Sequence, residues 1–400
     1  MASTKTIEII KSTAPVLQEH GVTITKVFYK LLFEKHPELK DTFNMTNQEK
    51  GIQQKALANA IFQYACHIDK LEMLGDSVET IAQKHASLSI PKEAYPIVGE
   101  NLLAAIKIVL GTAATKEIID AWAEAYADLA VIFVQREEAI YSNNEKSIGG
   151  FRGVKEFVVT NKVKESEVIT SFYLKRKDGV VVPKFLAGQY IALTTKIPNT
   201  VHKHTRNYSL SDSTDKDYLR ISVKKEEGDP KGIVSNYLHS NIEIGSSLSI
   251  GMPSGEFVLK ESRRPIVFIS GGVGITPLIS MFKEVSKKKN QEITFIQCAL
   301  NSKSHAFDNE INDLNNQKLK SVIVYNEPLA EDELGENYHY EGYFSAEIVE
   351  DLKINTESDF YFCGPKPFMA NVFKILLHLG VNEAHMNYEF FGPKEALLVS

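Results

Sequence analysis

One histidine stands where a metal ligand could lie. His85 sits in ETIAQKHASLSIP, residues 79–91, which the apolar spacing predicts as a helix stopped by Pro91. Val78 and Ile81 share its helix face, so the imidazole is expected to point toward the core. These residues alone leave two interpretations open: a core histidine bonded to a backbone carbonyl, or a metal ligand. Features elsewhere in the chain must decide between them.

A glycine-rich stretch further along could hold phosphates. PIVFISGGVGITPLISMF places glycines directly after a buried-strand pattern and before a helical one. Gly272 and Gly274 permit a tight turn and a close backbone approach, and the helix N-terminus supplies unpaired N–H groups. Pro277 fits the first helical turn, although a typical dinucleotide fingerprint has its third glycine here. The stretch therefore predicts a variant nucleotide loop, with ordinary turn glycines as the alternative.

Two other stretches carry groups that suit a flavin or a diphosphate. HTRNYSLSD offers Arg206 for a phosphate, Tyr208 for a flat ring and Ser209 as a hydroxyl donor. Strand alternation places Arg206 and Tyr208 on one face and Ser209 on the other. KGIVSNYLH places Gly232 and Ser235 at the start of a short helix. Taken singly, each is more typical of an edge strand or a helix cap, and only their order along the chain gives them weight.

Composition narrows the class of protein. The chain has 400 residues, 43% hydrophobic and 24% charged, which is typical of a soluble globular protein with several domains. Its net charge of -6 argues against a nucleic-acid or anionic-membrane footprint. The 3 cysteines lie far apart, so we expect no disulfide framework and a reducing compartment. Without a recognisable signal peptide or a long uncharged apolar run, a cytoplasmic protein with no stable membrane insertion is expected.

Hydrophobic periodicity divides the chain. Residues 1–141 repeat apolar residues at three and four, and the polar stretch SNNEKSIGG at 142–150 has linker chemistry. Residues 151–261 have period two with frequent turns, which predicts an antiparallel β-barrel. Residues 262–400 alternate buried strands with helices, which predicts an α/β doubly wound parallel sheet. The expected architecture is an all-α domain, a linker, a barrel and an α/β domain.

The second half resembles the ferredoxin–NADP reductase-like family, which binds FAD on the barrel and a nicotinamide nucleotide on the α/β domain. The motifs AGQY, RNYS, GIVS, GGVGITP, CGP and YEFFGP carry this resemblance, in that order. For Cys363, a small buried residue is an equally good interpretation. The cofactor-binding residues that the resemblance implies are Tyr190, Arg206, Asn207, Tyr208, Ser209, Gly232, Ser235, Gly272, Val273, Gly274, Ile275, Thr276, Pro277, Cys363, Gly364, Glu389, Phe390, Phe391, Gly392 and Pro393.

The helical front half resembles a globin, so that the whole chain resembles the flavohaemoglobin family almost from end to end. The stretches KVFYKLLF, HPELKDTFN and QQKALANAI carry this part of the resemblance. It makes His85 the proximal haem ligand, with Tyr29 as a catalytic residue of the distal pocket. The other implied pocket residues are Phe43, Gln53, Leu57 and Lys84. On periodicity alone, Tyr29, Phe43 and Leu57 would each be ordinary core residues.

Under the same resemblance, Tyr95 and Glu137 complete a proximal relay. An iron-bound imidazole usually donates its other N–H to an acceptor, which makes the ligand more electron-donating. Glu138 is the neighbour of Glu137, so a shift of one residue is open, as is a solvated acidic pair on a terminal helix. Lys84 lies about 100° around the helix from His85, where an exposed lysine is the plain alternative.

The resemblance implies a nitric oxide dioxygenase. Electrons from NADH or NADPH pass through FAD to haem b, and bound oxygen converts nitric oxide to nitrate. The expected partners are O2, nitric oxide and NAD(P)H, with no obligate protein partner. Alternatives are an NAD(P)H-dependent reductase of hydroperoxides, ferric ions or quinones, and an oxygen or nitric oxide sensor. Ser302, Lys303 and Ser304 offer phosphate contacts without an arginine, which favours NADH.

Overall fold

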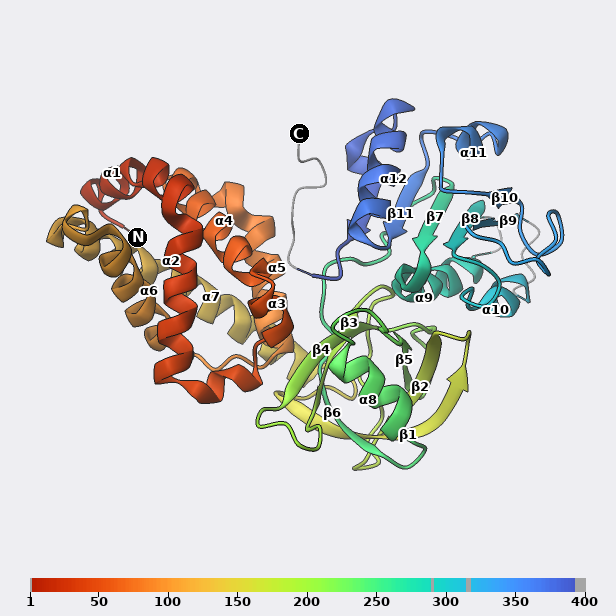
Figure 1. Cartoon of the computed structure of the whole chain (residues 1–400), viewed down its shortest axis with the longest axis horizontal. Coiled ribbons are helices and arrows are strands. Elements are labelled where there is room, and N and C mark those ends of the chain that lie inside the picture. Colours follow the sequence, from red (N-terminus) through yellow and green to blue (C-terminus); the bar gives the residue numbers. More distant parts are fainter. Residues whose placement is uncertain (1, 289–290, 314–317, 393–400) are drawn as a thin grey trace. The chain divides into compact units, whose positions relative to one another are not determined.

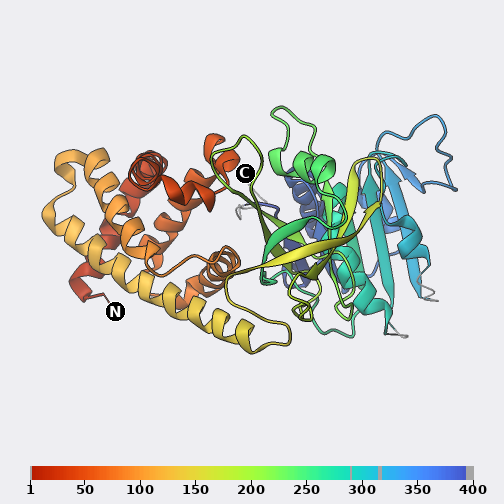
Figure 2. The ribbon, with the colours of Figure 1, turned by 90° about the horizontal axis from the view of Figure 1, so that it is seen from below.

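The computed structural model describes residues 2–288, 291–313 and 318–392 of the chain (Figures 1 and 2). Contacts divide it into two compact units. The first comprises the residues up to Val154 together with Thr194–Arg206, and the second comprises Lys155–Leu193 with the residues from Asn207 onward.

The first unit is helical, as the three-and-four periodicity predicts. Its core contains residues of α2, α4, α6 and α7, including Ile24, Phe28, Leu32 and Trp122. Gly21 of α2 lies against α4, where an added Cβ would lie 3.4 Å from the Cβ of Ala58, so small residues let the two helices approach closely. The helices are α1 (Thr4–Ser12), α2 (Ala14–Lys35), α3 (Met45–Glu49), α4 (Ile52–His67), α5 (Gly75–Ser87), α6 (Ala94–Leu110) and α7 (Lys116–Lys146).

Helices α5 and α7 pack together through alanines and one ion pair. Ala82 is fully buried in the cluster that α5 shares with α7. The Arg136 guanidinium of α7 donates to both carboxylate oxygens of Glu79, with Nη2 at 2.7 Å from Oε1. Helix α5 ends at Ser87, before Pro91, because Ser89 has a left-handed φ of 56°. The ion pair and the small residues fix the position of the last turn of α5, which contains His85.

Two segments differ from the sequence expectations. Helix α7 continues to Lys146, so the first part of the stretch 142–150 is helical rather than linker-like. In addition, Ala94–Ala113 has 20 residues with a mean hydropathy of 1.4, so one described helix does reach the length and composition of a membrane span. It is α6 with the turn that follows it, and Leu102, Ala105 and Ile106 bury its inner face in the globular core.

After the helices the chain forms a six-stranded sheet in the order β4-β3-β6-β1-β2-β5, most of which belongs to the second unit. The pairs β1–β2 and β2–β5 are antiparallel, and a bulge interrupts β1 between Val159 and Asn161. Alternate residues of a strand point to the same face, and on β1 the inward side chains of Phe157 and Val159 are 0% exposed. The elements are β1 (Val154–Lys164), β2 (Ile169–Arg176), β3 (Tyr190–Thr195), β4 (His204–Ser209), β5 (Leu219–Lys224), α8 (Ile233–Asn241) and β6 (Ser247–Gly251).

The remainder forms a parallel sheet in the order β10-β9-β8-β7-β11-β12 with helices around it. Two hydrophobic clusters cover the sheet, one containing α9 and the other α12. The strand order reverses between β7 and β11, and sheets of this kind bind ligands in a crevice at the carboxyl ends of the strands where the order reverses. The elements are β7 (Ile266–Gly271), α9 (Ile275–Ser286), β8 (Ile293–Ala299), α10 (Asp308–Asn312), β9 (Leu319–Tyr325), β10 (Tyr340–Glu341), α11 (Ala346–Asp351), β11 (Asp359–Cys363), α12 (Lys366–His378) and β12 (Met386–Glu389).

The predicted fold class is confirmed in all three parts. The helical front, the antiparallel sheet and the doubly wound parallel sheet follow one another along the chain. Helices α10 and α11 and strands β10 and β12 were not predicted. Each is six residues long or shorter, too short for a clear period.

Candidate functional site

The imidazole of His85 contacts a carboxylate and a phenol hydroxyl, each from a different helix. Its Nδ1 lies 2.8 Å from Oε1 of Glu137 on α7 and 3.0 Å from the hydroxyl of Tyr95 on α6. Tyr95 in turn donates its hydroxyl hydrogen to Glu137 Oε1 at 2.5 Å. Phe133 packs beside the imidazole with ring centroids 5.8 Å apart. The three residues proposed from the sequence are therefore in direct contact.

Glu137, and not Glu138, faces the histidine. Glu137 is 2% exposed, whereas Glu138 is exposed and pairs with Arg152 at 2.6 Å. The geometry therefore excludes a register shift by one residue. Burial raises the pKa of the Tyr95 hydroxyl well above its usual value, and its hydrogen bond to the Glu137 carboxylate raises it further. Tyr95 consequently stays a hydrogen-bond donor at neutral pH.

This arrangement fits a metal-bound imidazole. A carboxylate acceptor at Nδ1 selects the tautomer that carries its proton there, which leaves the lone pair of Nε2 available. Within the described residues, no hydrogen bond occupies Nε2 of His85. The acceptor of Nδ1 is also a buried carboxylate rather than the backbone carbonyl expected for an ordinary core histidine. The donor set therefore suits a single axial ligand for haem iron.

A second group of side chains gathers around Tyr29 of α2. Its ring lies 5.8 Å from both Phe33 and Phe43, measured between centroids. Burial raises the pKa of the Tyr29 hydroxyl well above its usual value, and the nearby side-chain amides of Gln48 and Gln53 lower it only in part. Tyr29 is 5% exposed, so its hydroxyl is a protonated donor in a nearly dry site.

Among the distal residues proposed from the sequence, Phe43 and Leu57 are half-buried and pack against the same helical core. Sequence reasoning missed Phe33 and Gln48. Nε2 of Gln48 is buried and has no hydrogen-bond partner in the described part of the chain, while its Oε1 accepts from Gln54 at 2.9 Å. An unsatisfied buried amide is costly, so this nitrogen is a donor that a ligand in the pocket would satisfy.

Lys84 precedes His85 on α5 and is half-buried. Burial lowers the pKa of its ammonium group. Lys84 is therefore not a fully solvated surface lysine, which was the alternative that the sequence left open.

The barrel residues lie as strand alternation predicts. Along β4, Arg206 and Tyr208 are partly exposed on one face, and Ser209 is buried on the other, with Asn207 exposed between them. Tyr190 begins β3 and its ring lies against Gly255, where an added Cβ would come within 2.9 Å of the ring. The glycine thus leaves room for the aromatic ring to lie flat along the backbone.

Local hydrogen bonds of Ser235 stabilise the turn at the start of α8. Ser235 Oγ donates to the Gly232 carbonyl at 3.3 Å and accepts from the Glu226 amide at 3.2 Å. An added Cβ on Gly232 would lie 2.5 Å from this hydroxyl. Ser235 therefore shapes the turn, and the helix amides after Gly232 are the groups that face outward for an anion.

The glycine loop lies at the crevice between β7 and β11. Gly272 has a left-handed φ of 52°, and an added Cβ would enter open space there. At Gly274 a Cβ would lie 2.1 Å from the carbonyl oxygen of Cys363, so only glycine lets the loop pass so close to the end of β11. Thr276 Oγ1 donates to the Val273 carbonyl at 3.0 Å. Ile275 and Pro277 are buried in the first turn of α9, and the free amides of a helix N-terminus are groups that can bind a phosphate.

Cys363 and Glu389 are paired residues on neighbouring parallel strands. The thiol donates to the Glu389 carbonyl at 3.5 Å, and burial raises the pKa of the Cys363 thiol well above its usual value. Burial also raises the pKa of the Glu389 carboxyl group to about 8. Cys363 is therefore a buried thiol rather than a reactive thiolate at neutral pH.

The terminal aromatic stretch follows β12. Phe390 is half-buried against Tyr388, with centroids 6.0 Å apart, whereas Phe391 is 52% exposed. Gly392 is exposed, and Pro393 lies outside the described residues. Gly364 follows β11, and an added Cβ would meet the ring of Phe368.

Three domain families match successive parts of this chain. Residues 26–132 match the globin family, residues 156–259 match an oxidoreductase FAD-binding domain, and residues 268–374 match an oxidoreductase NAD-binding domain. The order of the three matches is the order of the helical, antiparallel and parallel parts of the fold.

Relatives match the chain over its whole length. It is 46% identical over 403 residues to a "Flavohemoprotein" of Bacillus subtilis, covering 100% of both chains. A "Flavohemoprotein" of Rhodopirellula baltica is 47% identical over 407 residues, again covering 100% of both. In fold, the chain is similar to a flavohemoglobin from Malassezia yamatoensis with bound FAD and heme, with a TM-score of 0.84 and 24% identity, covering 98% of this chain and 99% of that one. The FAD/NAD-binding domain of a nitric oxide dioxygenase from Vibrio cholerae is 35% identical, with a TM-score of 0.55, over 60% of this chain and 99% of that domain.

Proposed function

Because this chain belongs to the flavohemoprotein family, we propose that it is a nitric oxide dioxygenase driven by NAD(P)H. The family supports the broader statement directly: the chain is an oxidoreductase whose globin domain is fused to FAD-binding and NAD-binding domains. The cofactors are haem, FAD and NADH or NADPH. The conversion of nitric oxide and O2 to nitrate is the specific reaction that we propose.

Each cofactor has a set of residues that would hold it. When bound, flavin would supply the conversion of one hydride, which carries two electrons, into single electrons for haem, and haem would supply the place where O2 and nitric oxide react. His85 would ligate the iron through Nε2, beside Phe43, Gln53, Leu57 and Lys84. The barrel residues Tyr190, Arg206, Asn207, Tyr208, Ser209, Gly232 and Ser235, with the C-terminal residues Glu389–Gly392, would hold FAD. The loop from Gly272 to Pro277, with Cys363 and Gly364, would hold the nucleotide.

The buried hydroxyl of Tyr29 is the observation that supports dioxygenation most directly. It stays protonated at neutral pH and lies in a site with two glutamine amides, as its pKa and contacts indicate. A hydrogen bond to a ligand that gains negative charge is worth roughly 1.5–3 kcal/mol. A pocket with such a donor retains O2 long enough for nitric oxide to arrive, whereas a plain electron-transfer haem needs none.

Several wider expectations belong to this proposal. We propose a haem domain over 1–141, a flavin domain over 151–261 and a nucleotide domain over 262–400, with 142–150 as the connection. We also propose a cytoplasmic location, since the cysteines Cys66, Cys298 and Cys363 are all free.

The proximal relay leads to the first prediction. Replacing Glu137 with Gln keeps the shape but removes the anion that accepts from His85 and Tyr95. A less electron-donating imidazole stabilises the reduced iron, so the midpoint potential of the haem is expected to rise, and activity is expected to fall by about 10- to 100-fold. Potentiometric titration checks the first effect. Glu138→Gln, which removes only a surface partner of Arg152, should leave the potential unchanged.

The loop after β8 leads to a prediction about nucleotide choice. Lys303 is paired with Glu331 at 3.2 Å, and Asp332 accepts from the Ser302 amide at 3.3 Å. If NADPH placed its 2′-phosphate at this loop, the phosphate would face the carboxylates of Glu331 and Asp332. Lys303, which could otherwise bind the phosphate, is already paired with Glu331. The preference is therefore expected to be for NADH.

Replacing Glu331 with Gln and Asp332 with Asn together should raise kcat/KM for NADPH severalfold while changing that for NADH much less. Steady-state reduction of cytochrome c or of flavin with both nucleotides measures the ratio. The matched control is Glu336→Gln, because Glu336 is exposed and lies in the same stretch between β9 and β10 as Glu331 and Asp332. An unchanged ratio in the double variant would contradict this assignment.

The proposed activity has a direct test. The purified protein should show haem and flavin absorption bands, and with NADH and O2 it should consume nitric oxide with nitrate as the product. Haem-free protein should lose this consumption while still oxidising NADH with ferric acceptors. Equal turnover of ferric ions, quinones or hydroperoxides with and without haem, together with no nitrate, would instead support the reductase alternative.

A further inference from the structure

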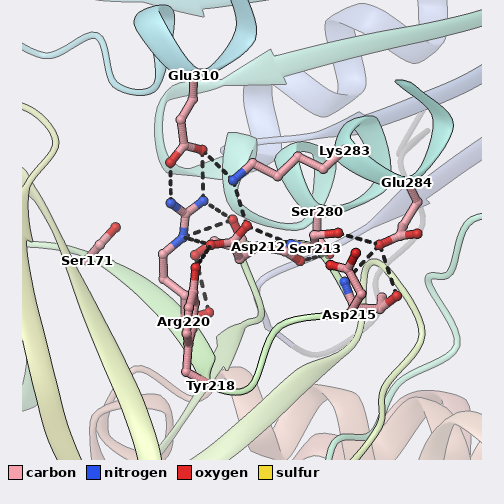
Figure 3. Close-up of polar contacts among 12 residues, drawn as sticks. Ser171, Asp212, Ser213, Asp215, Tyr218, Arg220, Ser280, Lys283, Glu284 and Glu310 are labelled. Carbon is pink, nitrogen blue, oxygen red and sulfur yellow. Dashed lines mark hydrogen bonds and ion pairs between the residues drawn. The ribbon is translucent and has the colours of Figure 1, made fainter. Parts of the chain in front are cut away.

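Four charged side chains meet in the interior of the second unit (Figure 3). This ion cluster consists of Arg220 of β5, Asp212, Lys283 of α9 and Glu310 of α10. Lys283 Nζ lies 2.6 Å from Asp212 Oδ1 and 2.9 Å from Glu310 Oε2. Arg220 Nη2 donates to Glu310 Oε2 at 3.0 Å, and its Nη1 donates to Oε1. Arg220 is 1% exposed and Asp212 is 3% exposed, while the side chains of Lys283 and Glu310 are partly exposed, so the ion cluster runs from the interior toward the surface and each charge has an opposite partner.

The members of the ion cluster come from segments that surround the two proposed cofactor sites. Asp212 follows β4, the strand with the proposed flavin residues, by a short connection. Lys283 lies on α9, the helix that begins directly after the glycine loop. Glu310 lies on α10, a few residues after the loop proposed to meet the adenosine end of the nucleotide. The ion cluster therefore joins one flavin segment to two nucleotide segments.

Helix α9 makes further contacts with the same barrel segment. Ser280 Oγ donates to the Asp212 carbonyl at 2.7 Å. Glu284 Oε1 accepts from the Thr214 amide at 2.8 Å and from Ser213 Oγ at 2.9 Å. Positions 280, 283 and 284 share one face of the helix. Contacts spread over a full turn restrain both sliding and rotation of α9 against residues 212–214.

A strained residue supports the arrangement from the nucleotide side. Phe307 has a φ of 66°, which is unusual for a bulky side chain, and it immediately precedes α10. Its ring lies 5.1 Å from the guanidinium carbon of Arg220. Stacking on the guanidinium and burial at 4% exposure hold a backbone conformation that is locally unfavourable.

Buried ion pairs seldom stabilise a fold more than apolar side chains of equal size would. A forked guanidinium between carboxylates is satisfied only over a narrow range of positions, however, so it fixes geometry better than apolar packing does. The ion cluster is thus suited to holding the barrel and the nucleotide-binding fold in one relative position.

We propose that Arg220, Asp212, Lys283 and Glu310 are positioning residues for hydride transfer, which hold the glycine loop and α9 in place relative to β4. The inference rests on the broader part of the proposed function, delivery of electrons from NADH to FAD, and is independent of the fate of nitric oxide. In that step NADH gives a hydride from its nicotinamide C4 to the flavin. With one proton from water, NADH and FAD become NAD⁺ and FADH2.

The test uses Glu310→Gln and Lys283→Met in the complete protein with its cofactors bound. Flavin reduction is followed by stopped flow without O2 or nitric oxide. At saturating NADH the rate is expected to fall by about 10- to 100-fold, since small displacements of reacting groups have effects of that size. The NADH concentration for half-saturation should change much less. NADH deuterated at C4 should give a larger isotope effect than in the unaltered protein, because the hydride step then limits the rate fully.

A second measurement does not depend on turnover. Hydrogen–deuterium exchange in the absence of NADH should show faster exchange of the Thr214 amide and of peptides from α9 in both variants. The control is Asp359→Asn, which breaks an ion pair with Arg264 inside the nucleotide-binding fold. The control is expected to lower stability, because it also loses an ion pair, but to preserve the hydride rate and the exchange at Thr214.

The proposal is overturned if both variants match the control in hydride rate, isotope effect and Thr214 exchange. If Glu310→Gln does not fold, Lys283→Met decides the question, since methionine retains the aliphatic stem of the lysine. Normal flavin reduction without nitric oxide consumption in the unaltered protein would refute the proposed dioxygenase reaction and leave this inference standing.

Discussion

Replacing His85 with alanine is expected to give a protein that binds flavin but no haem. The imidazole is the candidate axial ligand, and its Nδ1 is already held by Glu137 and Tyr95. Alanine leaves no atom in reach of the iron, so the Soret band should disappear while the flavin band and NADH oxidation by artificial acceptors remain. Absorption spectra of the two purified proteins, normalised to flavin, measure the loss.

A matched histidine shows whether the effect is specific. His67 lies in the last turn of α4 in the same unit, where its Nδ1 contacts the Gln63 carbonyl at 3.0 Å. His67→Ala should keep its full haem content. Adding imidazole to His85→Ala should restore part of the Soret band, because the small molecule fits the space of the lost ring. An unaltered Soret band in His85→Ala would refute the assignment of the ligand.

Replacing Tyr29 with Phe should have the second largest effect. The ring keeps its contacts with Phe33 and Phe43, and only the buried hydroxyl is lost. Losing a hydrogen bond of roughly 1.5–3 kcal/mol corresponds to about a 10- to 150-fold faster dissociation of O2 from the reduced protein. Nitric oxide consumption at low O2 should fall in parallel. Flash photolysis or stopped flow with an O2 scavenger measures the dissociation rate.

Tyr64→Phe removes a buried hydroxyl from the same helical core without touching the pocket. Its hydroxyl donates to the Ala125 carbonyl at 2.9 Å, so this control reports the cost of losing any buried tyrosine hydroxyl. It should lower thermal stability but leave O2 dissociation unchanged. Equal O2 dissociation rates in both variants and the unaltered protein would exclude Tyr29 as a donor to the ligand.

Sequence periodicity predicted the elements that are long and amphipathic. His85, Tyr95 and Glu137 lie on such helices, so a resemblance in sequence could bring them together before any coordinates were known. The choice between Glu137 and Glu138 needed the structure, because neighbouring helix positions differ by about 100° and only the packing of α7 on α5 shows which carboxylate is inward. Tertiary contacts were therefore needed to complete the prediction of the site, because they decide which carboxylate faces His85.

Other features had no sequence signal strong enough to find them. Gln48 lies on α3, which is 5 residues long and has no apolar repeat to place it in the pocket. Arg220 stands in an alternating strand pattern, where a charged residue is normally expected to face water. Its partner Glu310 is 90 residues away, and the burial of Arg220 depends on segments that pack on β5 from far along the chain. Pairings over such distances come from the assembled fold.

The place of β12 in the sheet has a consequence for protein synthesis. Met386–Glu389 joins the sheet as a parallel neighbour of β11, with Glu389 opposite Cys363. A ribosome must translate every other strand of this sheet before the sheet can receive β12 and the aromatic residues that follow it. A stop codon between β11 and β12 would thus spare the whole helical domain while removing the strand that pairs with β11. Such a truncated protein should still fold its helical domain but lose the proposed supply of electrons from the nucleotide.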